Sequence, residues 1–195
     1  MSKKMKNLQI LTLNKPNITD FASARNELLK NAKSDWVLFL DSDEVLSEAL
    51  KKEIKNLDPK DYVSFYIKRK IIFLGKEIGE DKILRIGKRN AGKWERAVHE
   101  TWQVKGKIGE LKGYIFHKTA ENIHEYIVKL NNYSSIHAVE NQKEGKHSNL
   151  LKIIFYPMFK FFQNIFQGRG FVFSMLQSFH SFLGWAKLWQ LQNEK

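Results

Sequence analysis

The sequence predicts an α/β fold, in which helices pack against a mixed β-sheet. Three observations lead to this fold class. Residues 36–40 are apolar without interruption, as in a strand that is covered on both faces. On either side of this run, apolar residues recur at spacings of three and four, which indicates helices. From residue 62 onward, apolar and polar residues alternate, which favours further strands.

The first predicted elements are a strand and a helix. Residues 8–13 have the composition of a short strand, and turn-forming residues follow at 14–17. Either Thr19 or Asp20 is expected to cap the next helix, because both side chains can accept a hydrogen bond from its first turn. The apolar positions that we expect to face the core are Phe21, Ala24, Leu28 and Ala32.

The apolar strand at 36–40 and a second helix complete the unit. Ser47 is expected to cap this helix, and Asp58 and Pro59 are expected to end it. Its inward positions are predicted to be Ala49, Leu50, Ile54 and Leu57. The order strand, helix, strand, helix is typical of proteins in which helices cover a sheet.

The middle of the chain predicts a mixed or antiparallel extension of the sheet. Short strands are expected at residues 63–67, 71–74, 82–86, 101–104 and 114–117. A long helix then follows, which Thr119 or Asn122 can cap and Gly145 can end. Its apolar stripe is predicted to consist of Ile123, Tyr126, Ile127, Leu130, Tyr133 and His137.

The composition changes again after residue 149. Phenylalanine, tryptophan and long aliphatic residues fill positions 150–189, with scattered basic residues and no acidic residue. The longest piece without ionised side chains, 170–186, is shorter than the roughly 20 residues of a membrane-spanning helix. A pair of amphipathic helices that lie in a membrane surface fits this composition better. We therefore predict two domains, an α/β domain at 1–147 and membrane-associating helices at 148–195.

The overall charge predicts an anionic partner. The formal net charge is +12, and the chain contains no cysteine, which excludes disulfides, thiolate metal sites and cysteine nucleophiles. The first 15 residues are too polar for a secretory signal, so we expect a cytoplasmic protein on the inner face of the cell membrane. The lysines form no recognisable nucleic-acid motif, and no nucleic-acid partner is expected.

Carboxylates follow the apolar strand directly. Asp41 and Asp43 would point to the same side if the strand geometry continued through them. Ligands bind beyond the carboxyl ends of strands in open α/β sheets. Two carboxylates at that place repel each other unless a cation lies between them. A divalent metal that carries a diphosphate is the natural candidate.

Three segments carry a resemblance to a known family. They read FASARN at 21–26, SDWVLFLDSDE at 34–44 and WERAVHE at 94–100. Together they resemble family 2 glycosyltransferases of GT-A fold, in particular the bacterial subgroup related to lipopolysaccharide core sugar transferases. The resemblance covers about residues 20 to 140. It implies a GT-A-like, Rossmann-like mixed sheet and the transfer of a sugar from a nucleotide-sugar donor to a lipid-linked or cell-envelope glycan acceptor.

The resemblance also implies roles for individual residues. It assigns Asp41 and Asp43 to Mg²⁺ or Mn²⁺ and the donor diphosphate, and it places Arg25 near the nucleotide. It places the acid/base and diphosphate contacts at Glu100 or His99. An inverting transfer needs a base for the acceptor hydroxyl, and we expect Glu100 to be that base, with His99 nearer metal or phosphate. Arg96, on the same segment, can donate hydrogen bonds to phosphate.

The N-terminal part departs from the family pattern. Family members have a further strand and turn that bind the nucleobase, whereas here only residues 8–13 precede the first helix. The sequence therefore predicts a domain that is truncated at its N-terminus. A separate polypeptide that supplies the absent half would be an additional partner.

The sequence also allows three other interpretations. The aspartates could simply stabilise the N-terminus of the next helix. The motif at 41–44 also resembles haloacid-dehalogenase-type phosphatases, but residues 140–195 contain no aspartate for the late acidic cluster of that family. Finally, the chain could be a non-catalytic, membrane-docked fragment, which would not bind nucleotide in a metal-dependent way. The metal-dependent glycosyltransferase is the function that the sequence favours.

Overall fold

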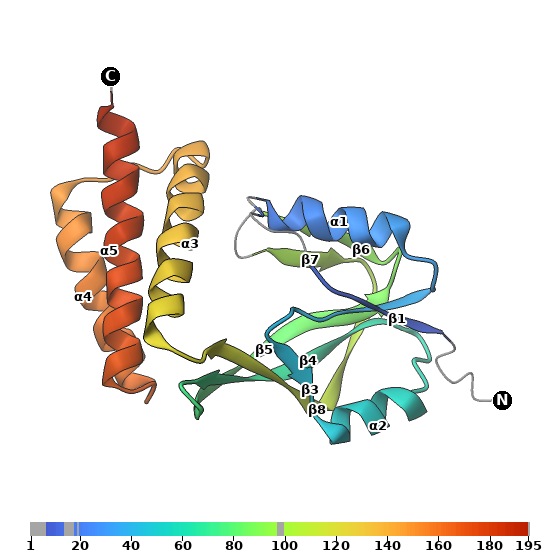
Figure 1. The fold of residues 1–195 in the computed structure, drawn as a ribbon. Coiled ribbons are helices and arrows are strands. Elements are labelled where there is room, and N and C mark those ends of the chain that lie inside the picture. The colour runs from blue at the N-terminus through green and yellow to red at the C-terminus, as the bar shows by residue number, and fades with distance from the viewer. Residues whose placement is uncertain (1–6, 14–17, 19, 97–99, 195) are drawn as a thin grey trace. The chain divides into compact units, whose positions relative to one another are not determined.

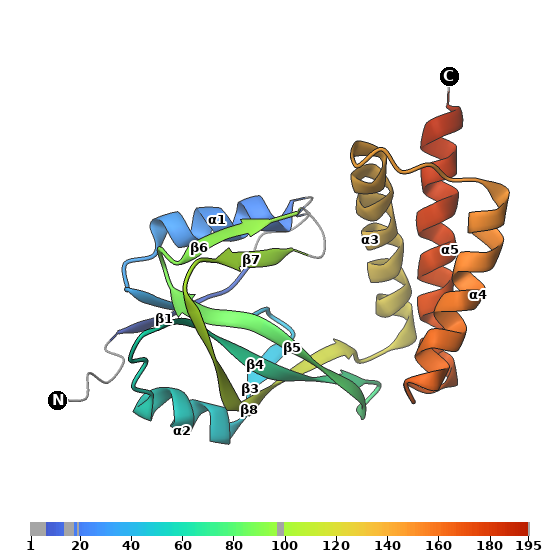
Figure 2. The same ribbon diagram turned by 180° about the vertical axis from the view of Figure 1, so that it is seen from behind.

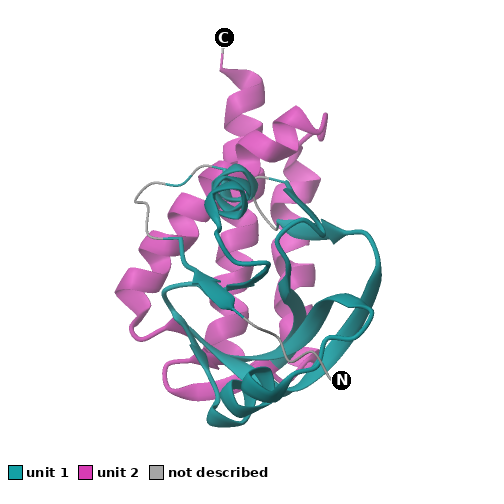
Figure 3. Ribbon diagram, turned by 90° about the vertical axis from the view of Figure 1, so that its right-hand side faces the viewer, with its two compact units in different colours: residues 1–71, 80–118 teal, residues 72–79, 119–195 magenta. Residues whose placement is uncertain are grey.

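The computed structural model describes residues 7–13, 18, 20–96 and 100–194. The chain divides into two compact units, which are coloured separately in Figure 3. The first unit comprises Met1–Ile71 and Glu80–Lys118 and contains the sheet. The second comprises Ile72–Gly79 and Thr119–Lys195 and contains three helices. The predicted boundary at residue 147 stays a prediction.

Helices and strands follow the order shown in Figure 1. The helices are α1 (Phe21–Asn31), α2 (Glu48–Asn56), α3 (Ile123–Lys143), α4 (Leu150–Phe166) and α5 (Phe171–Asn193). The strands are β1 (Leu8–Leu11), β2 (Trp36–Phe39), β3 (Glu44–Leu46), β4 (Tyr62–Phe73), β5 (Lys76–Lys88), β6 (Gly92–Glu95), β7 (Thr101–Val104) and β8 (Lys107–Ala120).

Six strands form one mixed sheet in the order β1-β2-β5-β4-β8-β3. The pair β1 and β2 is parallel, as expected for strands joined by the crossover helix α1, whereas β5 pairs antiparallel with β2 and β3 pairs antiparallel with β8. Strands β6 and β7 form a separate two-stranded ribbon. The predicted mixed sheet and the GT-A-like α/β fold class are therefore confirmed.

Strand β2 is buried on both faces, as its apolar sequence predicts. Trp36 and Leu38 belong to a core cluster that includes residues of α2. Val37 and Phe39 belong to a second cluster, with residues of α1, β6 and β7. All four side chains are buried, so α1 and the ribbon cover one face of the strand and α2 covers the other. Figure 2 shows α1 and α2 on opposite sides of the sheet.

Helix α1 begins as expected but turns a different face inward. The Asp20 side chain caps it by accepting a hydrogen bond from the backbone of Ser23, at 2.9 Å. Its buried residues are Ala22, Arg25 and Leu29, so the stripe predicted from Phe21 lies one position away from the buried face, although the predicted Ala32, just after the helix, is buried. An arginine on the inward face was unexpected, because sequence patterns count it as a surface residue. Its burial depends on the carboxylates described below.

Helix α2 largely follows the prediction. Ser47 caps it by accepting a hydrogen bond from the backbone of Leu50 at 3.1 Å, and the helix ends at Asn56. Leu50 and Ile54 are buried as expected, whereas Ala49 is exposed. Gly113 of β8 allows the close approach of this helix, because a Cβ atom there would lie 2.5 Å from the Cα atom of Leu50.

The chain turns sharply after β2. The backbone N–H of Glu44 donates a hydrogen bond to the carbonyl of Asp41 at 3.0 Å, and β3 begins at Glu44. Strand geometry therefore ends at Phe39, so the expectation that a continuing strand would align Asp41 with Asp43 was wrong. The turn instead sends each carboxylate to different partners, because alternation no longer determines their directions.

The second unit is a bundle of α3, α4 and α5. Asn122 caps α3 as one of the two expected residues, and Gly145 follows the helix with a left-handed φ of 71°. The inward positions of α3 that the prediction missed are Ser134, Ala138 and Asn141, whereas Ile123 and Ile127 are exposed. In the described part of the chain, no helix has both the length and the apolar composition needed to cross a membrane.

Candidate active site

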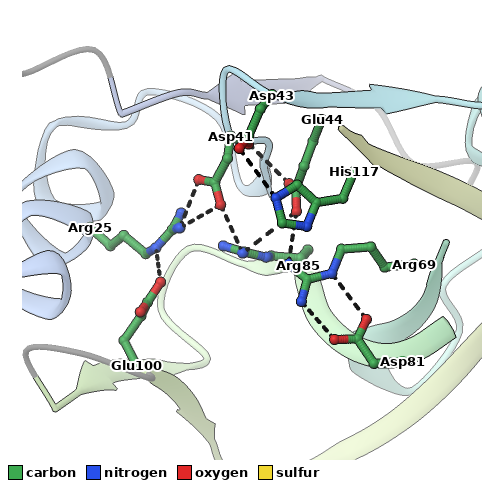
Figure 4. Close-up of polar contacts among 9 residues, drawn as sticks. All are labelled: Arg25, Asp41, Asp43, Glu44, Arg69, Asp81, Arg85, Glu100 and His117. Carbon is green, nitrogen blue, oxygen red and sulfur yellow. Dashed lines mark hydrogen bonds and ion pairs between the residues drawn. The ribbon is translucent and has the colours of Figure 1, made fainter. Parts of the chain in front are cut away.

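The site is built around the carboxylate of Asp41, directly after β2. The Nη2 atom of Arg25 donates hydrogen bonds to both of its oxygens, at 2.7 and 3.0 Å. The Nη2 atom of Arg85 donates to Oδ2 of the same carboxylate at 2.9 Å. Figure 4 shows the two guanidinium groups converging on Asp41. One carboxylate from the turn thus joins α1 to β5.

Two opposing effects determine the charge state of Asp41. Burial raises the pKa of this carboxyl, but the charges of Arg85 and Arg25 and the hydrogen bond from Arg25 lower it more. The resulting pKa is below its ordinary value, despite the nearby negative charge of Asp43. Asp41 is therefore ionised at neutral pH and provides a half-buried negative charge to both arginines.

Arg25 is nearly inaccessible to solvent, at 1% exposure. Its guanidinium lies over the rings of Phe39 and Trp94, with its central carbon 5.5 and 4.9 Å from the ring centroids. Its Nε atom donates to Oε1 of Glu100 at 3.0 Å. Because the aromatic rings and two carboxylates fix the guanidinium, Arg25 connects the turn after β2 to the residue just before β7.

Arg85 lies on β5, beside the end of β2. Ile86 pairs with Leu38 in the antiparallel register. The next residue back along β5, Arg85, therefore lies beside the carboxyl end of β2. Burial and the charge of Arg25 lower the pKa of Arg85, while Asp41, Glu44 and Glu100 oppose that shift. Its Nη2 atom also lies 3.8 Å from Oε1 of Glu44.

Arg69 of β4 extends the network on the other side of Glu44. It donates two hydrogen bonds to Asp81, at 3.0 and 2.6 Å, and one to Glu44, at 3.1 Å. Burial lowers the pKa of Arg69, but the hydrogen bonds and charges of Asp81 and Glu44 raise it above its ordinary value. The second oxygen of the fully buried Glu44 accepts the backbone N–H of Asp41, at 3.0 Å. Glu44 therefore fixes the turn that holds Asp41.

Three nitrogen atoms of this network are buried without a hydrogen-bond partner among the described residues. They are the Nη1 atoms of Arg25 and Arg85, whose side chains both hold Asp41 through Nη2, and the Nδ1 atom of His117. A buried donor without an acceptor is costly and calls for an explanation. An anionic group of a substrate is one ligand that would satisfy such donors.

Asp43 has a different partner from Asp41. Its Oδ2 atom lies 3.2 Å from Nε2 of His117 on β8, and the backbone N–H of Lys118 donates to the Asp43 carbonyl at 2.8 Å. The side chains of Asp43 and His117 are 30% and 19% exposed, respectively, so both can reach a ligand. His117 lies opposite Glu44 in the pairing of β3 with β8, which places it at this edge of the sheet.

Asp41 and Asp43 differ in how well their contacts suit the predicted metal site. Both oxygens of Asp41 accept arginine hydrogen bonds, so a cation at Asp41 would compete with two guanidinium groups. Asp43 and His117 offer a carboxylate and an imidazole, which fit two ligands of a divalent cation that takes others from phosphate and water. In the described ranges, no group of three or more potential protein ligands forms a closed metal cage.

The structure brings together three residues that the sequence singled out. Arg25, Asp41 and Glu100 form one chain of ion pairs, and Asp43 follows on the same turn. Arg96 is exposed and has a left-handed φ of 71° just after β6. His99 lies outside the described residues. The catalytic, donor and metal roles of all these residues stay predictions.

Sequence reasoning missed Arg69, Arg85, Asp81, Glu44 and His117 as members of this network. One signal was present for Arg85, because it lies among apolar residues of a predicted strand, where a buried charge requires a partner. No comparable local signal marks His117. Its proximity to Asp43 depends on the pairing of β3 with β8, which joins segments more than 70 residues apart.

Comparison with known proteins decides the family. The model of Glycosyl transferase family 2 matches residues 2–119, which is more than half of the chain. The chain belongs to glycosyl transferase family 2. This family 2 match includes α1, the turn after β2, β5 and β8, which together supply the network around Asp41.

Curated relatives of this family 2 chain come from bacteria. It is 26% identical over 187 residues to "Lipopolysaccharide core biosynthesis glycosyltransferase LpsC" of Rhizobium meliloti (strain 1021), covering 87% of this chain and 69% of that protein. It is 27% identical to an uncharacterized glycosyltransferase of Rickettsia typhi (strain ATCC VR-144 / Wilmington), and the match covers 81% of this chain and 63% of that protein. An uncharacterized glycosyltransferase of Rickettsia prowazekii (strain Madrid E) is also 27% identical, and the match covers 80% of this chain and 62% of that protein. The chain thus spans roughly two thirds of the length of these relatives.

Proposed function

We propose that this chain transfers a sugar from a nucleotide-sugar donor to a lipid-linked or cell-envelope glycan acceptor, with the aid of Mg²⁺ or Mn²⁺. The observation that carries the proposal is the network around Asp41, in which family 2 motifs from separate segments meet. The name of the Rhizobium relative supports the choice of acceptor class, since that protein is described as acting in lipopolysaccharide core biosynthesis.

Arg25 and Arg85 are our candidates for contact with the donor. The Nη1 atoms of both are buried without a partner among the described residues, and a diphosphate carries the acceptor oxygens that would satisfy them. Asp41 holds the two guanidinium groups in place through their Nη2 atoms. Because both Nη1 atoms are buried, binding of the donor must first uncover them, while Asp41 keeps the guanidinium groups in place. Arg96 is assigned to phosphate by its place in the motif.

Asp43 and His117 are the residues that would hold the cation. A bound divalent cation supplies Lewis-acid stabilisation of the negative charge on a departing nucleoside diphosphate. Asp43 lies in the turn that Glu44 fixes, while His117 is held in β8. The two residues that would hold the cation therefore come from elements whose backbone is hydrogen-bonded.

Glu100 is the proposed base. In an inverting transfer, a carboxylate removes the proton of the acceptor hydroxyl as that oxygen attacks the anomeric carbon. Arg25 holds Oε1 of Glu100 at 3.0 Å, which orients the carboxylate, and Oε2 is the atom that we expect to take the proton. The side chain of Glu100 is 16% exposed, so an acceptor can approach it. His99 is assigned to metal or phosphate contacts next to it.

A thermal-shift titration tests this proposal. A ligand that binds only the folded chain raises its stability by mass action. We expect UDP-, GDP- or CMP-type ligands to raise the melting temperature in the presence of Mn²⁺, and the shift to disappear in Asp43→Asn. Glu110→Gln is the matched control, because Glu110 pairs with Lys82 on the surface. A chain that shows no shift with any nucleotide would be a non-catalytic fragment or one half of a split enzyme.

A further inference from the structure

Helix α4 exposes a continuous apolar stripe. Large side chains at helical spacing lie on its outward side, and the stripe comprises Leu151, Phe155, Met158, Phe159, Phe162 and Phe166. Phe159 is 71% exposed and Phe166 is 85% exposed. Single exposed apolar residues are common in soluble proteins, whereas a contiguous stripe of this kind marks an interaction surface.

Helix α5 carries a second stripe of the same kind. It comprises Phe171, Met175, Phe179, Phe182 and Trp189, which recur at spacings of three, four and seven. The helices pack side by side, as both Figure 1 and Figure 2 show, and their rings meet where Phe161 contacts Phe171 at 5.6 Å between centroids. We call the two stripes together the aromatic face.

The inner sides of these helices combine apolar, small and polar residues. The buried residues of α4 are Pro157 and Asn164, and those of α5 are Phe173, Ser174, Gly184 and Leu188. The Ser178 hydroxyl joins the helices by donating to the Pro157 carbonyl at 2.9 Å. Bundles in water bury most of their large apolar residues, whereas α4 and α5 leave many of theirs exposed. An exposed apolar surface of this extent indicates an apolar partner.

The charges of this region point to an anionic surface. Residues 145–193 contain no aspartate or glutamate. Basic residues are present in α4 and in the turn after it, namely Lys152, Lys160 and Arg169, whereas the Lys187 ammonium of α5 donates to Asn131, Ser134 and Ser135 of α3. The Lys152 ammonium lies over the ring of Trp185, 5.1 Å from its centroid, so its aliphatic part runs along apolar surface while its charge stays accessible. Aromatic residues combined with basic ones are characteristic of helices that lie in an anionic lipid interface.

We propose that the aromatic face binds the surface of an anionic lipid bilayer, with α4 and α5 lying in the plane of the interface. The aromatic side chains enter the boundary between headgroups and acyl chains, and the basic residues meet the lipid phosphates. A second copy of the chain is a poorer occupant, because a two-fold contact would bring like charges of the same face together. The proposal stands on the helical unit and does not depend on the transfer reaction.

Flotation of the full chain with vesicles tests the proposal. The probes are vesicles of phosphatidylcholine mixed with phosphatidylglycerol, and vesicles of phosphatidylcholine alone. We expect the chain to float with the anionic vesicles, to bind the neutral ones at least tenfold less, and to lose affinity as salt is added. An equal affinity for both kinds of vesicle would overturn the electrostatic part of the proposal, and no flotation with either would overturn all of it.

Substitutions on the aromatic face make the test specific. The triple variant Phe155→Ser, Phe159→Ser and Phe162→Ser removes exposed side chains, so it is expected to fold, and its binding to anionic vesicles should fall at least tenfold. The control is Val128→Ser with Val139→Ser, which removes exposed apolar side chains of α3 and should leave binding unchanged. Self-association that is lost in the triple variant, without vesicle binding by the parent chain, would assign this face to a second copy instead.

Tryptophan fluorescence gives an independent measurement. Trp36, Trp94 and Trp102 are buried in the first unit, and Trp185 is half-buried against Tyr156, whereas Trp189 lies on the aromatic face and is 44% exposed. Insertion into lipid should shift the emission to shorter wavelength, and most of that shift should disappear in Trp189→Phe while flotation persists. Emission that stays constant during flotation would place the lipid contact elsewhere and contradict the proposal.

Discussion

The guanidinium of Arg25 binds both oxygens of Asp41 through one nitrogen, at 2.7 and 3.0 Å, while its Nε atom holds Glu100. The pair joins an inward-facing position of α1 to the turn after β2. Charge alone does not produce this arrangement, because only a planar group with several donors reaches two carboxylates in fixed directions.

The first prediction concerns the geometry of Arg25. Arg25→Lys keeps the charge but cannot contact Asp41 and Glu100 together, so the free energy of unfolding should fall by about 1 to 3 kcal/mol. Urea denaturation of the parent chain and the variant measures this difference in the free energy of unfolding. The matched control is Arg89→Lys, because Arg89 donates to the backbone carbonyl of Ala32 and an ammonium can do the same. Equal losses in the two variants would contradict the assigned role of the guanidinium.

The second prediction separates the two aspartates of the turn. Asp41→Asn leaves the buried arginines Arg25 and Arg85 short of a counter-charge, so it should cost about 3 to 5 kcal/mol of unfolding free energy. Asp43→Asn alters a partly exposed pair with His117 and should cost about 1 kcal/mol or less. Chemical denaturation of both variants checks the contrast. If Asp43→Asn proved the more destabilising, Asp43 would have the structural role and Asp41 would be the better metal candidate.

Local signals in the sequence were enough to predict much of the fold. Asp20, Ser47 and Asn122 cap their helices as expected, because capping depends on residues only three positions apart. The five apolar residues at 36–40 correctly indicated a strand covered on both faces. Such features are fixed by neighbouring residues, so periodicity and cap chemistry reveal them.

Long-range pairing limited the prediction of the site. Arg85 and Asp41 are 44 positions apart, and their contact depends on β5 pairing with β2. The inward face of α1 was missed for the same reason, since Arg25 is buried only because the carboxylates of Asp41 and Glu100 compensate its charge. A hydrophobicity pattern that counts arginine as polar contains no information on carboxylates far along the chain that compensate the arginine's charge. The family motifs nevertheless indicated the three segments, 21–26, 34–44 and 94–100, that supply Arg25, Asp41 and Glu100 to the site.

The third prediction concerns the base. Glu100→Gln keeps the size of the side chain and can still accept the hydrogen bond from Arg25, so the melting temperature should change little. Loss of the proton acceptor should lower kcat by about 10² to 10⁴-fold and leave nucleotide affinity nearly unchanged. Steady-state transfer assays with an active donor and acceptor pair measure kcat. Nucleotide titration measures the affinity. A variant that retains full kcat would remove Glu100 from the chemistry.

The fourth prediction uses Tyr126, which is buried in the helical unit. Burial raises the pKa of its phenol from 10.0 to about 12, and the hydrogen bond from Gln177 at 2.6 Å offsets only part of that shift. The folded state therefore holds the proton more tightly than the unfolded chain. This contribution to stability is fully present below pH 10 and is lost as the pH rises towards 12. The loss should amount to about 2 to 3 kcal/mol.

Comparison with Tyr126→Phe isolates this effect from the other groups that titrate in alkali. The variant lacks the phenol, so its free energy of unfolding should fall less steeply between pH 10 and 12 than that of the parent chain. Denaturation curves at a series of pH values give the difference. Parallel pH profiles would mean that the phenol ionises equally in both states, which would contradict the burial of Tyr126 against Phe73 and Phe173. A diverging pair of profiles would support the helical packing on which the aromatic face depends.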